Sequence, residues 1–312
     1  MPPAYPAATP EPSLRALLGD HGVLLDARTG LVPADARDWL RALPDRCVHA
    51  VVTDPPYALL EYEPTDHDKL RAGKGGVWRI PPTLDGVQRA PVPRFTVLGD
   101  ADVERLCAFF GEIAAELLRV LVPGGHLFVA SNPIVCWWTF DAFAGAGFER
   151  RGAVVRVVHT LRGGDRPKGA HAEFPDTTVM PRSCWEPWGL FRKPCEGTVA
   201  QNLRRWGTGA LRRKSGDEPF KDLIRCAPAR GAERAAAPHP SLKPQRFLRQ
   251  VVRASLPLGQ GVVVDPFAGS GSTLAAAAAV GYRSVGAERD PDYVALATAA
   301  FPRLRDLPDA SE

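Results

Sequence analysis

The chain has 312 residues and a formal net charge of +4 at pH 7, with 45% hydrophobic and 24% charged residues. These proportions are ordinary for a globular protein and exclude a collagen, a coiled coil and a wholly disordered chain. The six cysteines form no Cys-x-x-Cys pair, and no stretch approaches the roughly 20 apolar residues of a membrane span. The first residues lack the basic and apolar regions of a secretory signal. We therefore expect a soluble intracellular protein with reduced thiols, no membrane partner and no metal site.

The positive charge is concentrated in one part of the chain. Residues 151–250 contain 20 Lys and Arg against 9 Asp and Glu, whereas the remainder is acidic. Such a block suggests a surface that binds a polyanion, because each neutralised phosphate releases counterions. The alternative is a solvated surface in an arginine-rich protein.

Short β-branched runs alternate with segments of helical periodicity along the chain. The predicted elements, in chain order, are a strand at 48–53, a long loop at 58–100, a helix at 103–121 ended by Pro-Gly-Gly, a strand at 126–131, a helix at 134–144, strands at 154–158 and 189–192, a helix from 244, a strand at 262–264, a helix from 271, a strand at 283–287 and a helix from 292. This alternation favours an α/β fold with a mostly parallel sheet that is covered on both faces.

The first motif with chemical meaning is Asp54-Pro55-Pro56-Tyr57, which directly follows the strand predicted at 48–53. Ligands of parallel α/β sheets bind at the carboxyl ends of the strands. The prolines fix the backbone, so the Asp54 carboxylate and the Pro55 carbonyl could accept both hydrogens of one amino group. Tyr57 offers a ring on which a base could stack. The alternative is a simple turn with Asp54 as its cap.

The second motif runs from Val264 to Thr273 and combines a strand, a glycine-rich turn and the start of a helix. Gly269 and Gly271 would let the backbone approach a ligand closely. Neither a complete dinucleotide fingerprint nor a P-loop is present. Glu288 ends the next predicted strand, where a carboxylate can accept hydrogen bonds from a ribose diol. The alternative is a structural turn with an unrelated surface glutamate.

A third segment, at 238–244, indicates on its own only a helix start with proline near the first turn. Together, however, the three segments resemble the amino-group DNA methyltransferases, which use S-adenosylmethionine to modify N6 of adenine or N4 of cytosine. Residues 54–57 are similar to the family's catalytic DPPY motif, 265–273 to its cofactor motif and 239–244 to its HPxxKP segment. Residues 185–194 loosely resemble a late strand of the family with the pattern hExxLxFxK.

The resemblance implies a set of site residues. Asp35 lies where the family has a Gly-Asp pair that contacts the cofactor's adenine, although Ala34 replaces the glycine. The implied catalytic residues are Asp54, Pro55, Pro56 and Tyr57. The implied cofactor-binding residues are Asp35, His239, Lys243, Asp265, Phe267, Gly269, Gly271, Ser272, Thr273 and Glu288.

The catalytic motif precedes the cofactor motif, which is similar to the permuted β arrangement of the family. The resemblance thus implies a doubly wound, mostly parallel α/β sheet of the class I methyltransferase (Rossmann-like) type, with an inserted DNA target-recognition region. The expected divisions are a disordered tail at 1–19, a catalytic half at 20–160 that includes the long loop, a target-recognition region at 161–237 with a core strand near 188–192, a cofactor-binding half at 238–304 and a tail at 305–312.

The implied activity is direct methyl transfer to the exocyclic amino group of a base flipped out of duplex DNA, at a specific site and without a cysteine nucleophile. We favour N6 of adenine, because DPPY is the more usual adenine form. The alternatives are N4 of cytosine, methylation of RNA and an inactive DNA-binding scaffold.

Basic residues around Trp206 lie in the predicted target-recognition region, and arginine suits both phosphates and guanine edges. The residues expected to contact DNA are Arg204, Arg205, Trp206, Arg212, Arg213 and Lys214. The alternative is a solvated face. The implied partners are duplex DNA, a second copy in a homodimer and a cognate restriction enzyme, and the implied location is the cytoplasm in association with the nucleoid.

Overall fold

The computed structural model describes residues 13–57, 83–84, 87–88, 99–158, 167, 169–239 and 242–308. Most of the predicted loop at 58–100, most of the first tail and part of the last lie outside the described residues. Within the described part, no helix is long and apolar enough to cross a membrane, and the side chains form no cluster suited to a metal ion.

A nine-stranded sheet forms the centre of the molecule, in the order β1-β2-β11-β10-β3-β6-β8-β7-β9. Its strands are β1 (Val23–Leu24), β2 (Thr29–Pro33), β3 (Val48–Thr53), β6 (Leu121–Ala130), β7 (Glu149–Val157), β8 (Trp185–Arg192), β9 (Leu223–Arg225), β10 (Val262–Asp265) and β11 (Arg283–Glu288). The five strands from β2 to β6 in this order are parallel, whereas β1 and β8 run antiparallel to their neighbours. A separate two-stranded ribbon pairs β4 (Thr83–Leu84) with β5 (Val87–Gln88). The expected doubly wound, mostly parallel α/β sheet is confirmed.

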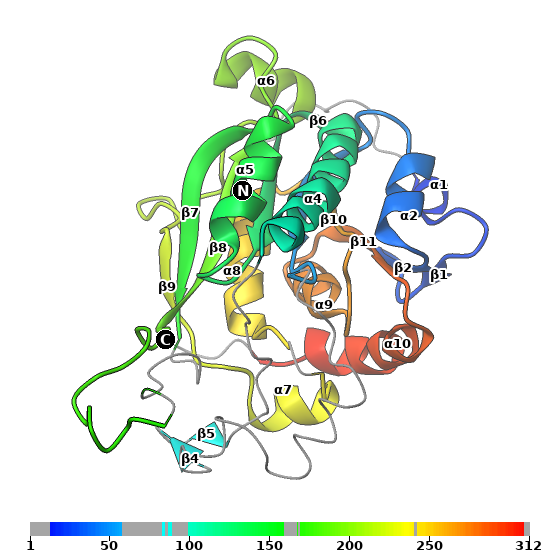
Figure 1. Ribbon diagram of the computed structural model, residues 1–312. Coiled ribbons are helices and arrows are strands. Elements are labelled where there is room, and N and C mark those ends of the chain that lie inside the picture. The colour runs from blue at the N-terminus through cyan, green and yellow to red at the C-terminus, as the bar shows by residue number, and fades with distance from the viewer. Residues whose placement is uncertain are drawn as a thin grey trace.

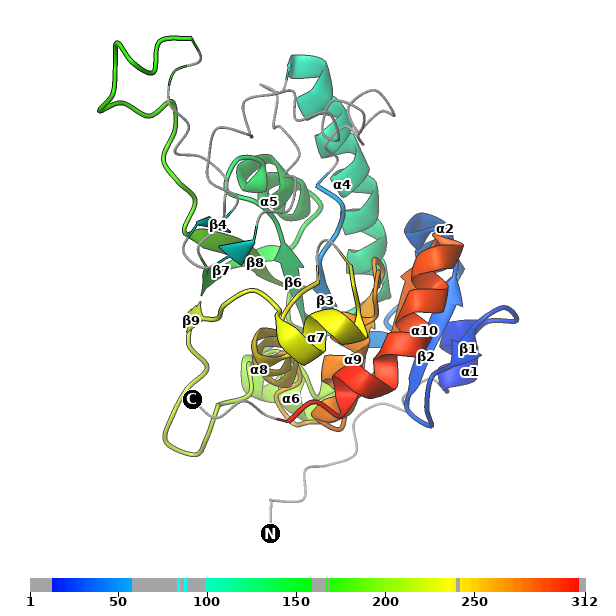
Figure 2. The same cartoon turned by 90° about the horizontal axis from the view of Figure 1, so that it is seen from below.

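Helices cover both faces of the sheet, and Figure 2 shows the two helical layers on either side of the strands. The helices are α1 (Leu14–Leu18), α2 (Ala36–Ala42), α4 (Asp100–Val120), α5 (Cys136–Gly145), α6 (Val199–Trp206), α7 (Gly231–Ala236), α8 (Gln245–Ser255), α9 (Ser272–Ala279) and α10 (Pro291–Arg305). The side chains of β3 divide the core: Val48 and Val51 pack with α2, α4 and α5, whereas Ala50 and Val52 pack with α8 and α9.

The order of the strands brings the two halves of the chain together. β10 lies beside β3 and parallel to it, with Val263 opposite Ala50 and Val264 opposite Val51. Because parallel neighbours end at the same edge, the residues that follow β3 and β10 meet there although they are far apart in sequence. This edge is called the carboxyl edge below, and the opposite one the amino edge.

The segment Pro123-Gly124-Gly125 differs from its prediction, since it lies inside β6 and does not simply end the preceding helix. The register between β3 and β6 shifts here, which marks an irregularity in the ladder. Gly124 has φ 77°, and a Cβ on it would lie 2.9 Å from the backbone of Gly209. Only glycine fits both the conformation and this close approach.

Residues 161–237 contribute directly to the main sheet. They contain β8, which lies between β6 and β7, and β9, which forms the outer edge. The same segment contains α6, which lies at the top of the sheet in Figure 1, whereas α7 lies at the bottom. The proposed target-recognition region is therefore interleaved with the core in the described residues.

Candidate active site

Two predicted motifs meet at the carboxyl edge. Asp54 follows β3, and Asp265 ends the neighbouring strand β10. The Thr53 hydroxyl donates a hydrogen bond of 2.7 Å to Asp265 Oδ1 and so links the two strand ends. The long-range pairing of β3 with β10 thus places the catalytic motif directly beside the cofactor motif.

A cavity of about 700 Å³ opens at this junction. Its volume falls within the range of roughly 300–1,000 Å³ that is usual for small-molecule sites. The sequence-predicted residues that line it are Asp35, Asp54, Pro55, Pro56, Tyr57, His239, Lys243, Asp265, Phe267, Gly269, Ser272, Thr273 and Glu288. Among the predicted cofactor residues only Gly271 does not line the cavity.

The glycine-rich turn is held in place by Glu288 at the end of β11. The backbone N–H of Gly269 donates to Glu288 Oε2 at 2.8 Å, and that of Asp290 donates to Oε1 at 2.9 Å. Gly271 does not line the cavity, and its backbone lies close to α10. Its φ is 76°, and a Cβ on it would lie 3.2 Å from the Cβ of Ala297, so the glycine lets α9 pack closely against α10.

Asp265 is buried, with 3% of its surface exposed. Burial raises the pKa of its carboxyl to about 6, against the opposing effect of hydrogen bonds from Thr53, Thr273 and the Phe267 backbone. All three donors are neutral, and each belongs to β3 or to the glycine-rich turn and the helix after it. The carboxylate of Asp265 therefore braces the turn against β3.

Both carboxylate oxygens of Asp54 have protein donors. The Tyr57 hydroxyl donates to Oδ1 at 2.8 Å, and the Lys243 ammonium donates to Oδ2 at 2.6 Å. Burial raises the pKa of Asp54, while Lys243 and the Tyr57 hydroxyl counteract that rise. Tyr57 was predicted to stack on a base, but here its hydroxyl is engaged by the catalytic motif itself and its ring packs partly against the core.

Lys243 was predicted among the cofactor-binding residues, but its ammonium lies between two carboxylates. Besides Asp54, it lies 3.8 Å from Glu186 Oε1. Burial alone would lower the pKa of Lys243, but Asp54 and Glu186 outweigh this effect and raise it, so the ammonium stays protonated at neutral pH. Lys243 therefore contacts the motif at 54–57 directly.

Sequence reasoning did not predict Glu186 and Arg156, which extend the pair of Asp54 and Lys243 into a row of four charges. Glu186 on β8 forms an ion pair of 2.8 Å with Arg156 on β7, and it accepts a 2.7 Å hydrogen bond from the Trp188 indole. Asp54, Lys243, Glu186 and Arg156 thus alternate in sign. This alternation matters because an uncompensated buried charge is costly. The one available signal was the glutamate of the hExxLxFxK pattern, which matches Glu186.

The remaining wall of the cavity contains aromatic and imidazole rings. Phe109 and Phe267 lie with their ring centroids 6.1 Å apart, and His239 packs edge-on against Tyr293 at 4.5 Å. Burial, together with the charge of Lys243, lowers the pKa of His239 to about 4, so its imidazole is neutral at pH 7. Phe109 and Tyr293 were not predicted, since nothing in their local sequence marks them.

Asp35 lies at the mouth of the cavity as the N-cap of α2. Its Oδ1 accepts a 2.9 Å hydrogen bond from the backbone N–H of Arg37. Partial burial would raise the pKa of Asp35, but the backbone and side-chain N–H groups of Arg37 outweigh it and lower the pKa. The carboxylate thus stays ionised while it faces the cavity.

The residues expected to contact DNA do not form one surface. The side-chain amide of Asn202 donates to the carbonyl of Pro123 at 2.9 Å, and this bond fixes α6 at the amino edge. β3 has six residues, so this edge lies about 20 Å from Asp54 at 3.3 Å per residue. Arg204 and Arg205 are exposed there, away from the cavity.

The burial of Trp206 is contrary to its expected contact with DNA. The residue is only 8% exposed, and its indole N–H donates to Glu196 Oε2 at 3.0 Å. The guanidinium of Arg205 covers the ring at 5.3 Å from its centroid. Arg212, by contrast, lies beside α8, where its backbone N–H donates to the Ala254 carbonyl at 2.9 Å. The predicted DNA-contacting set is therefore split between two places.

Comparisons with known proteins agree with the motifs. Residues 186–299 match the family model N6_N4_Mtase, described as DNA methylase. The chain is 32% identical over 78 residues to the Type II methyltransferase M2.DpnII of Streptococcus pneumoniae, which is 25% of this chain and 29% of that protein. The match therefore spans less than a third of the curated relative.

Solved structures resemble the fold over nearly the whole chain. The cytosine-N4-specific PvuII DNA methyltransferase has a TM-score of 0.57 and 16% identity, over 92% of this chain and 89% of that one. The complex of M1.HpyAVI with S-adenosylmethionine has a TM-score of 0.54 and 17% identity, over 87% and 98% of the two chains. These likenesses confirm the resemblance to the amino-group DNA methyltransferases: the chain has the class I fold of these proteins, and its residues 186–299 match the N6/N4 DNA methylase family.

Proposed function

We propose that this protein is a site-specific DNA methyltransferase that uses S-adenosylmethionine and modifies the exocyclic amino group of a base flipped out of the duplex. The observation that carries the proposal is the junction of two motifs at one cavity, where Asp54 after β3 lies beside the glycine-rich turn after β10. The family match at residues 186–299 supports the same activity.

The residues present fit S-adenosylmethionine. The cavity of about 700 Å³ can hold a nucleoside-sized ligand. Two carboxylates, Asp35 and Glu288, face it and can accept hydrogen bonds from amino or hydroxyl groups, while Phe109 and Phe267 offer an apolar wall for a ring. We assign the cofactor to Asp35, Phe267, Gly269, Ser272, Thr273 and Glu288, supported by Asp265, Gly271, His239 and Lys243 from behind or beside them. When bound, the cofactor supplies a methyl group on a positively charged sulfur.

Asp54 and Pro55 would hold the target amine. A carboxylate has about four lone-pair positions, so the bonds from Tyr57 and Lys243 leave Asp54 able to accept a hydrogen from an amino group. The rigid Pro55 carbonyl can accept the second hydrogen, with Pro56 fixing the turn. Two such acceptors favour a pyramidal nitrogen and stabilise the positive charge that develops on it, an effect of several kcal/mol in typical sites.

We favour N6 of adenine as the target because the motif at 54–57 is the DPPY form. The likeness in fold to an N4-cytosine enzyme keeps N4 of cytosine as the second candidate. The similarity to a Type II methyltransferase supports a cognate restriction enzyme as a partner. Within this proposal, duplex DNA is the substrate, the site of action is the cytoplasm at the nucleoid, and we expect a homodimer.

The test is to incubate the purified protein with unmethylated genomic DNA and S-adenosylmethionine, digest the DNA and analyse the nucleosides by mass spectrometry. We expect N6-methyladenine. Detection of N4-methylcytosine would instead identify cytosine as the target base. If calorimetry shows cofactor binding but DNA of diverse sequence gains neither product, the proposed reaction is wrong.

A further inference from the structure

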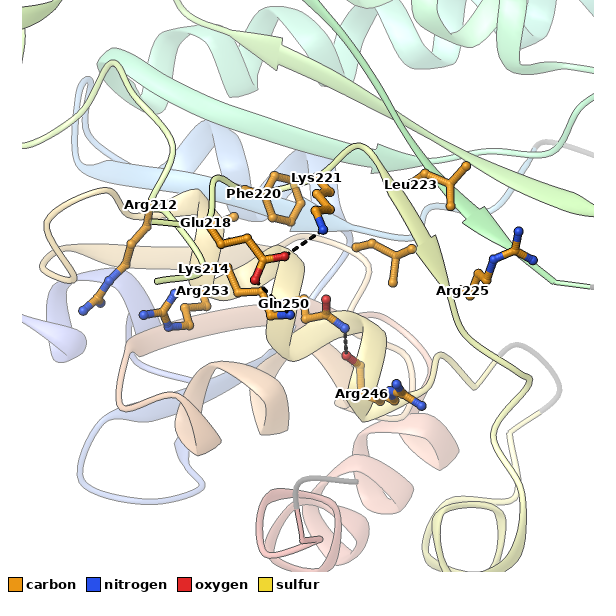
Figure 3. A pocket seen from close by; sticks show the side chains of 12 residues that line it. Arg212, Lys214, Glu218, Phe220, Lys221, Leu223, Arg225, Arg246, Gln250 and Arg253 are labelled. Atoms are coloured by element: carbon orange, nitrogen blue, oxygen red, sulfur yellow. Dashed lines mark hydrogen bonds and ion pairs between the residues drawn. The ribbon is translucent and has the colours of Figure 1, made fainter. Parts of the chain in front are cut away.

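A second concave site lies outside the candidate active site, between α8 and the segment 212–225 (Figure 3). The groove has a volume of about 240 Å³. Six of the side chains that line it are cationic, and Glu218 is the single carboxylate among them. The cations are Arg212, Lys214, Lys221, Arg225, Arg246 and Arg253.

The charges in this groove are unevenly compensated. Glu218 pairs with Lys221 at 2.8 Å and with Lys214 at 3.4 Å. Arg225 and Arg246 are exposed, and no carboxylate among the residues that the structure describes forms an ion pair with either. The groove thus presents two guanidinium groups whose donors are turned to solvent rather than to an anion of the described chain.

Several side chains that line the groove are held in place by contacts with the rest of the protein. Phe220 packs edge-on against the buried Phe128 of β6, with ring centroids 6.2 Å apart. The Arg212 guanidinium donates to the Tyr282 hydroxyl at 2.8 Å, and Arg253 donates to the backbone carbonyl of Arg213 at 2.6 Å. Each of these arginines uses one donor for the protein, and a guanidinium has five. The anchored arginines therefore keep donors for a ligand in a fixed position.

The groove leads to the candidate active site. Arg246 lies in the first turn of α8, three residues after Lys243, which binds Asp54. Arg225 ends β9, and the backbone carbonyl of the next residue, Cys226, accepts a hydrogen bond of 3.2 Å from Arg156 in the row of four charges. Figure 3 shows Arg225 and Arg246 on one side of the groove and Arg212, Lys214 and Arg253 on the other. Arg225 and Arg246 thus lie at the end nearest to Asp54.

The volume and the positive charge of the groove favour one kind of ligand. Small-molecule sites usually have volumes of roughly 300–1,000 Å³ and mostly apolar walls, and this groove is both smaller and more cationic. Along α8, Arg246 and Arg253 are seven residues apart, a rise of about 10 Å, which corresponds to roughly three nucleotide steps along the duplex axis. Several cations spread over this length suit a phosphodiester backbone rather than a single free anion.

We propose that this groove holds the sugar-phosphate backbone of the duplex beside the flipped base, with Arg225 and Arg246 as its phosphate contacts nearest to Asp54. The inference rests on the proposed function and names the surface through which the DNA is held. It replaces the α6 arginines as the principal DNA contacts, since those lie at the opposite edge of the sheet.

The test compares two double variants of the full chain that each lose two positive charges. R225A/R246A changes the groove, and R204A/R205A changes the amino edge. Binding of a fluorescent 30-base-pair duplex is measured by anisotropy between 50 and 300 mM salt, and circular dichroism and cofactor binding verify that the variants fold. Each lost phosphate contact lowers the slope of log K against log salt by about 0.9, so R225A/R246A should lower it by about 1.8. R204A/R205A should keep the wild-type slope.

The result overturns the inference if R225A/R246A keeps the wild-type slope, if R204A/R205A alone flattens it, or if the wild type does not bind the duplex. A slope that changes only with structured RNA also overturns it, since the ligand would then be RNA. The nucleoside assay is run on the same preparations. Methylated DNA with an unchanged slope refutes only the groove, whereas a flattened slope without any methylated product supports the groove and refutes the proposed reaction.

Discussion

Two aspartates lie side by side at the carboxyl edge, and their surroundings differ. Asp54 follows β3 and accepts hydrogen bonds from an ammonium and a phenol, at 2.6 and 2.8 Å. Asp265 ends β10 and accepts hydrogen bonds only from neutral groups, including the Thr53 hydroxyl at 2.7 Å. Both are largely buried, and burial raises the pKa of both.

The difference lies in what compensates each charge. Lys243 places a full positive charge beside Asp54, which opposes the effect of burial on the pKa of Asp54 and stabilises its ionised form. Asp265 has no cation on its carboxylate among the described residues, and its pKa of about 6 makes ionisation costly at neutral pH. The same residue type, at the ends of adjacent strands, therefore pairs with a cation in one case and braces a turn through neutral donors in the other.

The largest expected effect comes from Asp54→Asn. The amide keeps the size of the side chain, but it loses the fixed negative charge that would stabilise the developing cation. We expect methyl transfer to fall by about 10²–10³-fold, because this is typical of losing one preorganised electrostatic contact. Single-turnover kinetics with DNA measure the transfer step, and calorimetry should show nearly unchanged cofactor affinity. Near-wild-type turnover would refute the assignment of Asp54.

The matching change at the second aspartate, Asp265→Asn, should act on stability. The folded pKa of about 6 lies above the ordinary value of 3.8, so the folded state holds this proton more tightly than the unfolded state. Stability from this group is present at low pH and is lost as the pH rises from about 4 to about 6. The loss amounts to about 3 kcal/mol, since one pKa unit corresponds to about 1.4 kcal/mol.

Urea unfolding of the wild type and Asp265→Asn, each at pH 4.5 and pH 8, measures this effect. The asparagine carries no titrating proton, so its stability relative to the wild type should increase toward the higher pH. Other groups titrate equally in both proteins and cancel in the comparison. A difference between the two proteins that does not vary with pH would contradict the raised pKa of Asp265.

Lys243→Met tests whether the lysine serves Asp54 or the cofactor. Removing the ammonium takes away an effect that lowers the pKa of Asp54, so the pKa should rise and the acidic limb of the kcat profile should move to higher pH. We expect kcat to fall by about 10–100-fold, because a small misplacement of a catalytic group has an effect of this size. Lys243→Arg, which keeps the charge, should recover part of the rate.

The same variants distinguish between two roles of Lys243: binding the cofactor, as the sequence predicted, and positioning Asp54, as the geometry suggests. A lysine that binds the cofactor would change cofactor affinity and leave the pH profile of kcat in place. Unchanged cofactor affinity with a shifted profile would identify Lys243 as a positioning residue for Asp54.

These aspartates also show how far the sequence could be interpreted. The strands at 48–53 and 262–264 were predicted with nearly correct limits, because continuous β-branched runs bounded by turn residues are local signals. The convergence of Asp54 with the glycine-rich turn could be predicted from the resemblance and from the rule that ligands bind at strand ends.

The pairing of Lys243 with Asp54 could not be predicted, since 189 residues separate them and their contact depends on how α8 packs under the sheet. Lys243 was grouped with the cofactor-binding residues because its segment, 239–244, precedes the cofactor motif in sequence. The position of α6 likewise depends on buried hydrogen bonds from Asn202 and Thr208 to the Pro123 carbonyl, which no local pattern reveals. β2 was missed because its five residues include glycine and proline, which are uncommon in strands.

The smallest expected effect concerns the turn that Asp265 braces. Gly271 and Gly281 both have positive φ, 76° and 80°, but only Gly271 faces a neighbour, since a methyl group added there would lie 3.2 Å from the Ala297 Cβ. Gly281→Ala should lower the free energy of unfolding by about 1 kcal/mol, because alanine is strained in the left-handed conformation. Gly271→Ala should lower it by about 1–2 kcal/mol, because the new methyl group also presses on α10. Urea unfolding of both variants measures the difference. A double-mutant cycle with Ala297→Gly, measured alone and together with Gly271→Ala, isolates the contact between the two methyl groups. Ala297→Gly destabilises α10 by itself, but it should cost less in the Gly271→Ala background, since the two sites are in contact and their effects couple. Equal destabilisation at both glycines would mean that Gly271 is required for its φ alone, and a loss of cofactor affinity without a loss of stability would return Gly271 to the binding role that the sequence indicated.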